Sequence, residues 1–231
     1  IEEHAQQLTK RVVVVFLGAN PTVEHLGNIT YAYTLADAAA RAVELAGRGR
    51  PVFAATQRWI KGLYTGGTLA SEAAMLIRDE LGLPDGDTSH ARGYMLRSEG
   101  HEVIDLGDDV YTRGRPHPMI DPSTRVERLP ALFDDEGTAV ILLDIVIGFG
   151  ASEDPAGALV PAIQDGIARA IEAGREVVVV ASVCGTRADV QGFDEQQRAL
   201  RDAGVTVLPN NAAAVRHAVS LVADRLREPD G

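Results

Sequence analysis

The chain has 231 residues and a formal net charge of −11, with 45% hydrophobic and 24% charged residues. These proportions are typical of an Ala/Val/Leu-rich α/β protein, and they exclude a disordered, fibrous or membrane-embedded chain. The negative charge repels phosphate backbones and anionic lipids at long range, so we expect neither a nucleic acid nor a membrane as a partner. A bound anion would have to be held by local dipoles or by a few arginines.

Cys184 is the only cysteine, so the sequence offers neither an internal disulfide nor a cysteine-rich metal site. This suits a reducing cytoplasm, which is the location we expect. The longest apolar run near the N-terminus, 12–17, is far shorter than the ~20 residues that span a bilayer, and no signal-like stretch precedes it. Because the first methionine is Met75, we expect that a preceding domain is absent from this chain.

Apolar runs that end in glycine alternate with stretches of helical period, which predicts βα units around a parallel sheet. The expected strands are 12–17, a short strand ending at 63–64, 102–106, 139–146, 176–182 and 205–208. The expected helices are 35–46 with Thr34 as its cap, 69–81, about 122–133, 156–173, 194–203 and 212–227. The run 139–146 is the most apolar, so it should be the central strand, buried on both faces.

A polar link at 47–51 breaks this pattern, and a fresh series of five βα units follows from residue 60. Five units with right-handed crossovers most economically form a flavodoxin-like, doubly wound parallel sheet of strand order 2-1-3-4-5. In that order the switch point lies between the first and third strands, where the loops 65–68 and 148–154 would meet. Ligands of such sheets bind at this point.

Three glycine-containing turns follow predicted strands and precede predicted helices. They contain Gly66, Gly67 and Thr68; Gly148, Phe149 and Gly150; and Gly185 and Thr186. Glycine lets the backbone approach a ligand closely, and a helix N-terminus presents free N–H groups with about half a positive charge. Each turn by itself could be an ordinary βα connection, with Thr68 as an N-cap. Together they predict one pocket for a carboxylate or a phosphate.

The loop 113–122 places a histidine between two prolines and close to several arginines. Arg115 and Arg125, together with Arg113, could clamp an oxyanion, while His117 could act as an acid, a base or a nucleophile. The alternative is a surface loop in which Asp121 caps the next helix and Arg125 is its solvated partner. We take His117 as the catalytic candidate because the prolines restrict where its ring can point.

The remaining chemically interesting residues are weaker candidates. We expect the other histidines to be structural or solvent-facing, with His25, His90 and His101 in loops, and Cys184 to be a small core residue. Asp105, Asp108 and Asp109 could hold Mg²⁺, but a solvated loop is the more ordinary interpretation. No pair of histidines has metal-ligand spacing, so no metal site is expected.

Five segments of the sequence closely resemble the C-terminal part of the FdrA family. They read GLYTGGTLASEAAMLI, IDLGDDVYTRGRPHPMIDPSTR, AVILLDIVIGFGASEDPAGAL, VVVVASVCGTRADVQ and VLPNNAAAVRHA, and the resemblance runs from about residue 11 to about 225. This family consists of acyl-CoA-synthetase-like proteins related to both subunits of succinyl-CoA synthetase. The resemblance implies that 58–231 is a flavodoxin-like ligase domain similar to the C-terminal domain of the β subunit, and that 1–57 ends an α-subunit-like ligase domain.

By the same resemblance, the turns with Gly66-Gly67 and Gly148-Phe149-Gly150 would contribute to a site for succinate and phosphate. The sequence departs from the synthetase in two places: Gly66 stands where the β subunit has an asparagine, and the phosphohistidine stretch His-Ala-Gly-Ala is absent after Gly18. No nucleotide-binding ATP-grasp domain is recognisable either. We therefore do not expect this chain alone to ligate acids through a phosphohistidine.

The resemblance favours a component of an FdrA-type acyl-CoA synthetase that binds a small carboxylate and an acyl or carbamoyl phosphate. It would work with companion subunits or as a homo-oligomer. No cofactor is expected on this chain itself, and coenzyme A would bind through the missing N-terminal domain. One alternative is a subunit of an oxamate carbamoyltransferase in purine nitrogen catabolism, another is a non-catalytic module that docks partner subunits, and a third, weaker one is an independent CoA-dependent synthetase.

Overall fold

The computed structural model describes residues 12–18, 25–26, 29–46, 51–84 and 91–223, together with Ala5. The chain divides into two compact units, Ile1–Pro51 and Val52–Gly231, each of which is described by itself. The sequence analysis puts this boundary a few residues later, between 57 and 58. Among the described residues, no helix is long and apolar enough to cross a bilayer.

Some expectations from the sequence fall outside the described residues. These are the placement of His90, most of the link at 47–51 and the end of the last helix at 224–227.

The N-terminal unit has a small sheet and one helix. Its strands β1 (Val12–Val15), β2 (His25–Leu26) and β3 (Ile29–Ala32) lie in the order β1-β3-β2, with β1 parallel and β2 antiparallel to β3. The helix α2 (Leu35–Ala46) begins as predicted, because Oγ1 of Thr34 accepts the N–H of Asp37 at 3.0 Å. The sequence analysis predicts neither β2 nor β3, since strands this short show no clear period of two.

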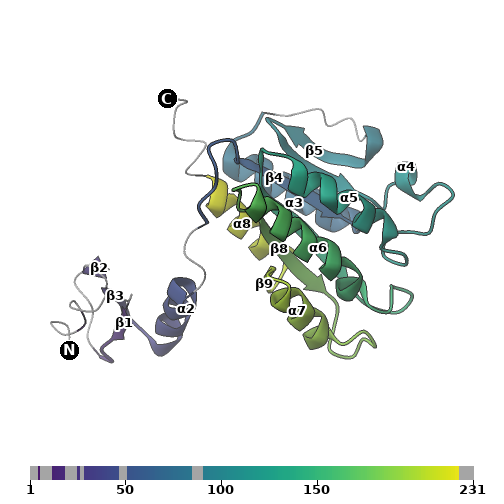
Figure 1. The fold of residues 1–231 in the computed structure, drawn as a ribbon. Coiled ribbons are helices and arrows are strands. Elements are labelled where there is room, and N and C mark those ends of the chain that lie inside the picture. Colours follow the sequence, from purple (N-terminus) through teal and green to yellow (C-terminus); the bar gives the residue numbers. More distant parts are fainter. Residues whose placement is uncertain are drawn as a thin grey trace. The chain divides into compact units, whose positions relative to one another are not determined.

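The second unit is a six-stranded sheet covered by helices (Figure 1). Its strands are β4 (Trp59–Tyr64), β5 (Tyr94–Ser98), β6 (His101–Asp105), β7 (Thr138–Val146), β8 (Val178–Cys184) and β9 (Thr206–Leu208). Its helices are α3 (Gly67–Leu81), α4 (Asp109–Thr112), α5 (Ser123–Asp134), α6 (Pro155–Glu172), α7 (Phe193–Asp202) and α8 (Asn211–Val222), with a 3-10 turn η1 (Ala91–Gly93).

The sheet order is β5-β6-β4-β7-β8-β9, and every neighbouring pair is parallel except β5 and β6. Numbered along the chain, the five parallel strands run 2-1-3-4-5, so the predicted flavodoxin-like topology is confirmed. The antiparallel strand β5 is an addition that the sequence analysis does not predict. It joins β6 through Glu99 and Gly100, both at positive φ, which is the backbone of a tight hairpin turn.

The strand β7 lies at the centre of the sheet and is buried on both faces, as predicted. Val140 and Leu142 point into a core formed with α3 and α8, whereas Ile141, Leu143 and Ile145 point into a second core formed with α5, α6 and α7. The two helical layers therefore cover opposite faces of one sheet (Figure 1). This doubly wound arrangement leaves the carboxyl ends of the strands open to their loops.

The second core contains one very close contact between α5 and α6. A Cβ on Gly166 would lie 2.2 Å from Cδ2 of Phe133, which is fully buried. Only a glycine therefore lets the Phe133 ring pack against the backbone of α6.

At the amino ends of the strands, His101 is the first residue of β6 and is fully buried rather than in a loop as predicted. Its Nδ1 accepts the N–H of Ile60 at 3.1 Å, while its Nε2 has no hydrogen-bond partner among the described residues. Burial lowers the pKa of His101 to about 4, and the nearby positive charge of Lys61 adds to this shift. His101 is therefore a neutral, structural histidine.

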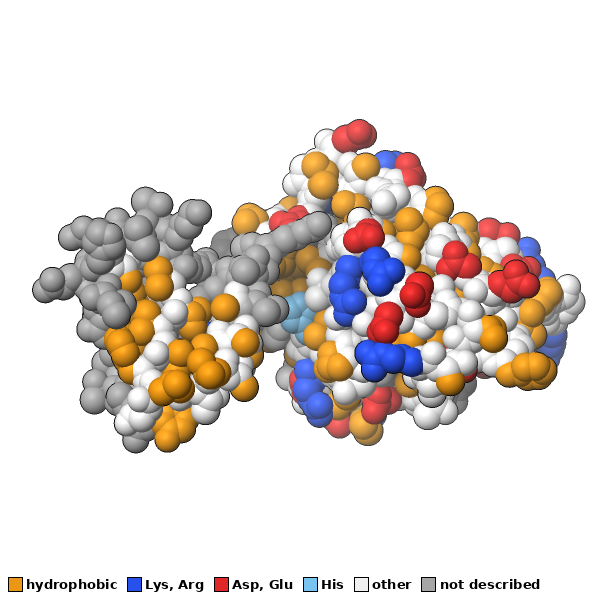
Figure 2. Space-filling model, turned by 90° about the horizontal axis from the view of Figure 1, so that it is seen from below, with side chains coloured by type: hydrophobic (Ala, Val, Ile, Leu, Met, Phe, Trp, Pro, Cys, Tyr) orange, Lys and Arg blue, Asp and Glu red, His pale blue; other side chains and the backbone are white. Residues whose placement is uncertain are grey.

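The surface of the second unit carries charges of both signs. On the face that Figure 2 shows, basic and acidic side chains lie side by side instead of forming a patch of one sign. The exposed ion pairs of this unit include Arg187 with Asp194, whose Nε and Oδ2 are 2.9 Å apart. Cys184 is also exposed, so its expected place in the core is wrong, because it ends β8 at the carboxyl edge of the sheet.

Candidate functional site

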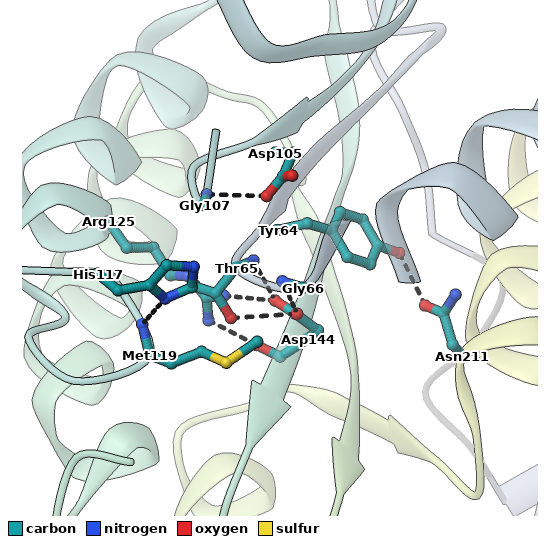
Figure 3. A network of polar contacts seen from close by, with 10 residues as sticks. All are labelled: Tyr64, Thr65, Gly66, Asp105, Gly107, His117, Met119, Arg125, Asp144 and Asn211. Carbon is teal, nitrogen blue, oxygen red and sulfur yellow. Dashed lines mark hydrogen bonds and ion pairs between the residues drawn. The ribbon is translucent and has the colours of Figure 1, made fainter. Parts of the chain in front are cut away.

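The candidate site lies at the N-terminus of α3, where β4 ends between its two neighbours in the sheet. Asp105 is the last residue of β6 on one side of β4, and Asp144 lies near the end of β7 on the other side. The loop between α4 and α5 brings His117 and Met119 to the same place (Figure 3). This is the predicted switch point of the sheet.

The turn from β4 to α3 is held by the carboxylate of Asp144. Its Oδ1 accepts the N–H of Thr65 at 2.9 Å, and its Oδ2 accepts the N–H of Gly66 at 2.8 Å and the hydroxyl of Thr65 at 3.1 Å. Asp144 is fully buried, so these bonds replace the water that its charge would otherwise need. The N–H of Gly66 is consequently not free for a ligand, contrary to expectation.

Arg125 supplies the positive charge that balances Asp144. Its guanidinium pairs with the Asp144 carboxylate, and its Nη1 also donates to the backbone carbonyl of Asp144 at 2.5 Å. Arg125 is only 3% exposed, and although burial lowers its pKa, the Asp144 charge acts in the opposite direction and favours the charged form. The expected role of Arg125 as an open clamp for an oxyanion is therefore wrong, because the side chain lies beneath the site.

The tautomer of His117 follows from its backbone contact. The N–H of Met119 donates to Nδ1 of His117 at 3.2 Å, so the proton of the neutral ring resides on Nε2. In this state Nε2 can donate a hydrogen bond but has no lone pair for attack on phosphorus or carbon. Of the three roles considered for His117, acid, base and nucleophile, this geometry favours the acid, which donates from Nε2.

His117 lies beside Asp105 because Gly107 carries no side chain. A Cβ on Gly107 would be 2.6 Å from Nε2 of His117 and 3.0 Å from Oδ1 of Asp105. The N–H of Gly107 donates to the same Oδ1 at 2.8 Å. A glycine is needed at this position to let the two side chains approach each other.

Asp105 also faces the first turn of α3. A Cβ on Gly67 would lie 2.7 Å from Oδ2 of Asp105. Burial raises the pKa of Asp105, and so do the like charges of Asp144 and Asp108, while the Gly107 N–H and His117 lower it. Asp105 is therefore a carboxyl group that is easier to protonate than an exposed one.

The first turn of α3 keeps open donors. The helix begins at Gly67, with Gly66 rather than Thr68 as the N-cap and with no side-chain cap. The N–H groups of Gly67 and Thr68 have no hydrogen-bond acceptor in the part of the chain that the structure describes. Thr68 is exposed and Gly67 is partly exposed, and both lie at the positive end of a 15-residue helix.

The other two predicted turns lie at the same edge of the sheet, and one N–H group in each of them is already occupied. The N–H of Gly148 donates to Oε1 of Gln191 at 3.2 Å, and the N–H and hydroxyl of Thr186 both donate to Oδ2 of Asp189, at 2.6 and 3.0 Å. A Cβ on Gly185 would lie 2.1 Å from Ile147, so this glycine serves packing. The prediction that the N–H groups of all three turns bind one ligand together is thus wrong for Gly148 and Thr186.

The remaining predicted residues lie outside the network. Phe149, and with it Gly150, is fully exposed in the loop after β7, and Arg115 is exposed and pairs with Glu127 at 3.0 Å. In the described part of the chain, no three His, Cys, Asp or Glu side chains gather as metal ligands. Asp108 instead caps α4 by accepting the N–H of Val110.

The sequence analysis missed Asp144, although a signal for it exists. Asp144 is the single charge in the most apolar run of the chain, and an aspartate within a buried strand requires a cationic partner and several donors. Asp105 was considered only as a metal ligand.

Comparisons with known proteins agree with this fold. The family model described as CoA-ligase matches residues 63–221. The uncharacterized protein YahF of Escherichia coli (strain K12) is 35% identical over 224 residues, which cover 88% of this chain and 44% of that protein. The chain also resembles the dinucleotide forming acetyl-coenzyme A synthetase 1 of Ca. Korarchaeum cryptofilum, in complex with phosphate and ADP, with a TM-score of 0.50 and 17% identity over 86% of this chain and 39% of that one. This likeness concerns the fold alone.

Proposed function

Because this chain belongs to the CoA-ligase family, we propose that it is the ligase-domain part of an FdrA-type, acyl-CoA-synthetase-like enzyme. In this proposal it binds a small carboxylate, or the phosphoryl group of an acyl or carbamoyl phosphate, at the N-terminus of α3. The supporting observation is the pair of open N–H donors on Gly67 and Thr68, at the topological switch point where doubly wound sheets bind their ligands.

The residues around these two donors fix the turn, and the helix terminus supplies the charge. Asp144 and Arg125 neutralise each other and fix the turn that precedes α3, so the two N–H groups are oriented before a ligand arrives. The helix terminus supplies about half a positive charge, an effect of about 0.3–2 kcal/mol on a bound anion. Such a site binds a simple anion weakly, so further affinity would come from parts of the enzyme outside this chain.

Two reactions, acyl-CoA synthesis and carbamoyl transfer, are compatible with the proposed site. The chain spans less than half the length of YahF and of the synthetase, so their whole activities are not carried over. An acyl-CoA synthetase and an oxamate carbamoyltransferase both handle a mixed anhydride of phosphate, and the same two donors serve either. Binding of coenzyme A through a domain outside this chain stays a prediction, as do companion subunits.

The proposal is tested by removing one donor. Gly67 is the first residue of α3 and Gly66 before it is extended, with φ −105° and ψ 111°, so proline fits position 67 and deletes its N–H. The variant Gly67→Ala adds the same Cβ beside Asp105 but keeps the N–H, and it is the matched control. We expect sulfate, phosphate, succinate or carbamoyl phosphate at millimolar concentration to raise the melting temperature of the wild type by about a degree or more.

For a ligand that binds, Gly67→Pro should weaken affinity at least about fivefold relative to Gly67→Ala, as expected for one lost bond to a charged group. Equal affinities of the two variants would contradict the role of this N–H group. No shift with any of the four anions would favour the alternative of a non-catalytic docking module.

A further inference from the structure

The carboxylate of Asp105 presents an unpaired oxygen to the proposed anion site. Asp105 is 7% exposed, and its Oδ1 is already bonded to the N–H of Gly107. Its Oδ2 has no hydrogen-bond donor within the described ranges and faces Gly67, the first residue of α3. A carboxylate oxygen without a donor therefore lies beside the turn where an anion would be held.

The charges around this turn do not favour an anion while Asp105 is ionised. Asp144 and Arg125 cancel, and the helix terminus contributes about half a positive charge. The ionised Asp105 outweighs that half charge, and Asp108 adds to the negative potential. Two negative groups about 4 Å apart repel by several kcal/mol near a protein surface, so a second anion needs a compensating proton.

The hydrogen bonds of the two candidate acceptors, His117 and Asp105, differ in what a proton would break. If His117 took it, Nδ1 would become a donor and would lose its hydrogen bond from the N–H of Met119. Oδ2 of Asp105 has no donor to lose. The charged and titratable groups that face Asp105 are Asp144 and Asp108, which favour its protonation, and His117, which opposes it. Protonation of Asp105 therefore breaks no hydrogen bond, whereas protonation of His117 breaks one.

We propose that Asp105 is a specificity-determining residue, and that an oxyanion binds at the N-terminus of α3 together with one proton held between Oδ2 of Asp105 and the anion. This inference rests on the proposed anion site. The protonated carboxyl group donates to the ligand, while the N–H groups of Gly67 and Thr68 donate to its other oxygens. The site therefore selects oxyanions that bring an acidic hydrogen, such as hydrogen phosphate, over fully ionised ones at neutral pH.

The test uses sulfate, which stays fully ionised and must take its proton from solvent. We expect the dissociation constant of sulfate, measured by calorimetry on the full chain between about pH 6 and pH 8, to rise with pH by up to about tenfold per unit, because binding takes up a proton that becomes scarcer as the pH rises. Titrations in two buffers of different ionisation enthalpy should report uptake of close to one proton per sulfate. A dissociation constant that changes less than about twofold over this range would overturn the proposal.

Two variants identify the proton acceptor. Asp105→Asn should bind sulfate at least about tenfold more tightly at pH 8 and lose most of the pH dependence, since the opposing charge is gone. His117→Gln should keep the pH dependence of sulfate binding. If this variant loses the pH dependence, the proton belongs to His117 and the proposal is overturned. Asp109→Asn removes an equal charge from an exposed position of α4, and it should behave as the wild type.

The outcomes separate this inference from the proposed function. If sulfate binds with one affinity at all pH values and Gly67→Pro weakens it, the anion site stands and the role of Asp105 is wrong. If the wild type binds no anion at any pH, both are wrong.

Discussion

Removing the positive partner of the buried ion pair tests whether Asp144 is the group that holds the turn before α3. Arg125→Met keeps a similar length of side chain but leaves the Asp144 carboxylate fully buried without a cation. Asp144 would retain the N–H groups of Thr65 and Gly66 and the Thr65 hydroxyl. The change therefore removes the ionic contact together with the hydrogen bond from Nη1 of Arg125 to the Asp144 carbonyl, and it leaves the bonds to the turn in place.

The size of the effect follows from the burial of both groups. Breaking a buried pair by removing one partner costs about 3–5 kcal/mol, whereas replacing both partners is often close to neutral. We expect Arg125→Met to lower the free energy of unfolding by about 3–5 kcal/mol. Adding Asp144→Asn should restore at least about 2 kcal/mol of that loss, because the uncompensated charge is gone. A typical domain is stable by about 5–15 kcal/mol, so both effects are measurable.

The assay is urea unfolding of the wild type, both single variants and the double variant, followed by circular dichroism at neutral pH. Independent sites give additive changes within about 0.5 kcal/mol. Additivity of Arg125→Met and Asp144→Asn would refute the reasoning, since it would mean that the two side chains do not interact across the core.

Two further predictions concern the rest of the second unit. The folded state keeps His101 neutral down to about pH 4, whereas His101 of the unfolded chain is protonated near pH 6.5. Stability is therefore lost as the pH falls from about 6.5 to about 4. We expect the free energy of unfolding to be about 2 kcal/mol lower at pH 5 than at pH 7. His101→Gln should remove this part of the pH dependence in urea titrations, and an unchanged dependence would show that other groups cause it. Gly166→Ala should destabilise by about 2 kcal/mol because its Cβ collides with Phe133. The double variant with Phe133→Leu should recover part of that loss in the same assay, and an undiminished loss would contradict the collision.

Much of the fold could be predicted because its signals are local. The apolar run of β7, the helical period of α3, α5, α6 and α7, and the glycines that end the strands are all visible in the sequence. Right-handed crossovers then leave few topologies for five βα units, so the strand order follows from rules that need no side-chain detail. The strand β5 was not predicted because its five residues show too little alternation of apolar and polar side chains.

The roles at the candidate site depended on contacts between residues far apart in the chain. The sequence predicted the switch point between the first and third parallel strands, where the structure has it, but it treated Arg125 as an exposed clamp. Arg125 and Asp144 are 19 residues apart, and only the packing of α5 on β7 shows that each is the partner of the other.

The sequence by itself determined the five parallel strands of the second unit, their order and most of its helices, because hydrophobic periodicity and turn chemistry act over a few residues. The tertiary structure alone decided which backbone donors remain open and which carboxylates face them. Hydrogen bonds and charge pairs are settled by distances of a few ångströms, and those distances exist only after β4, β6 and β7 lie side by side.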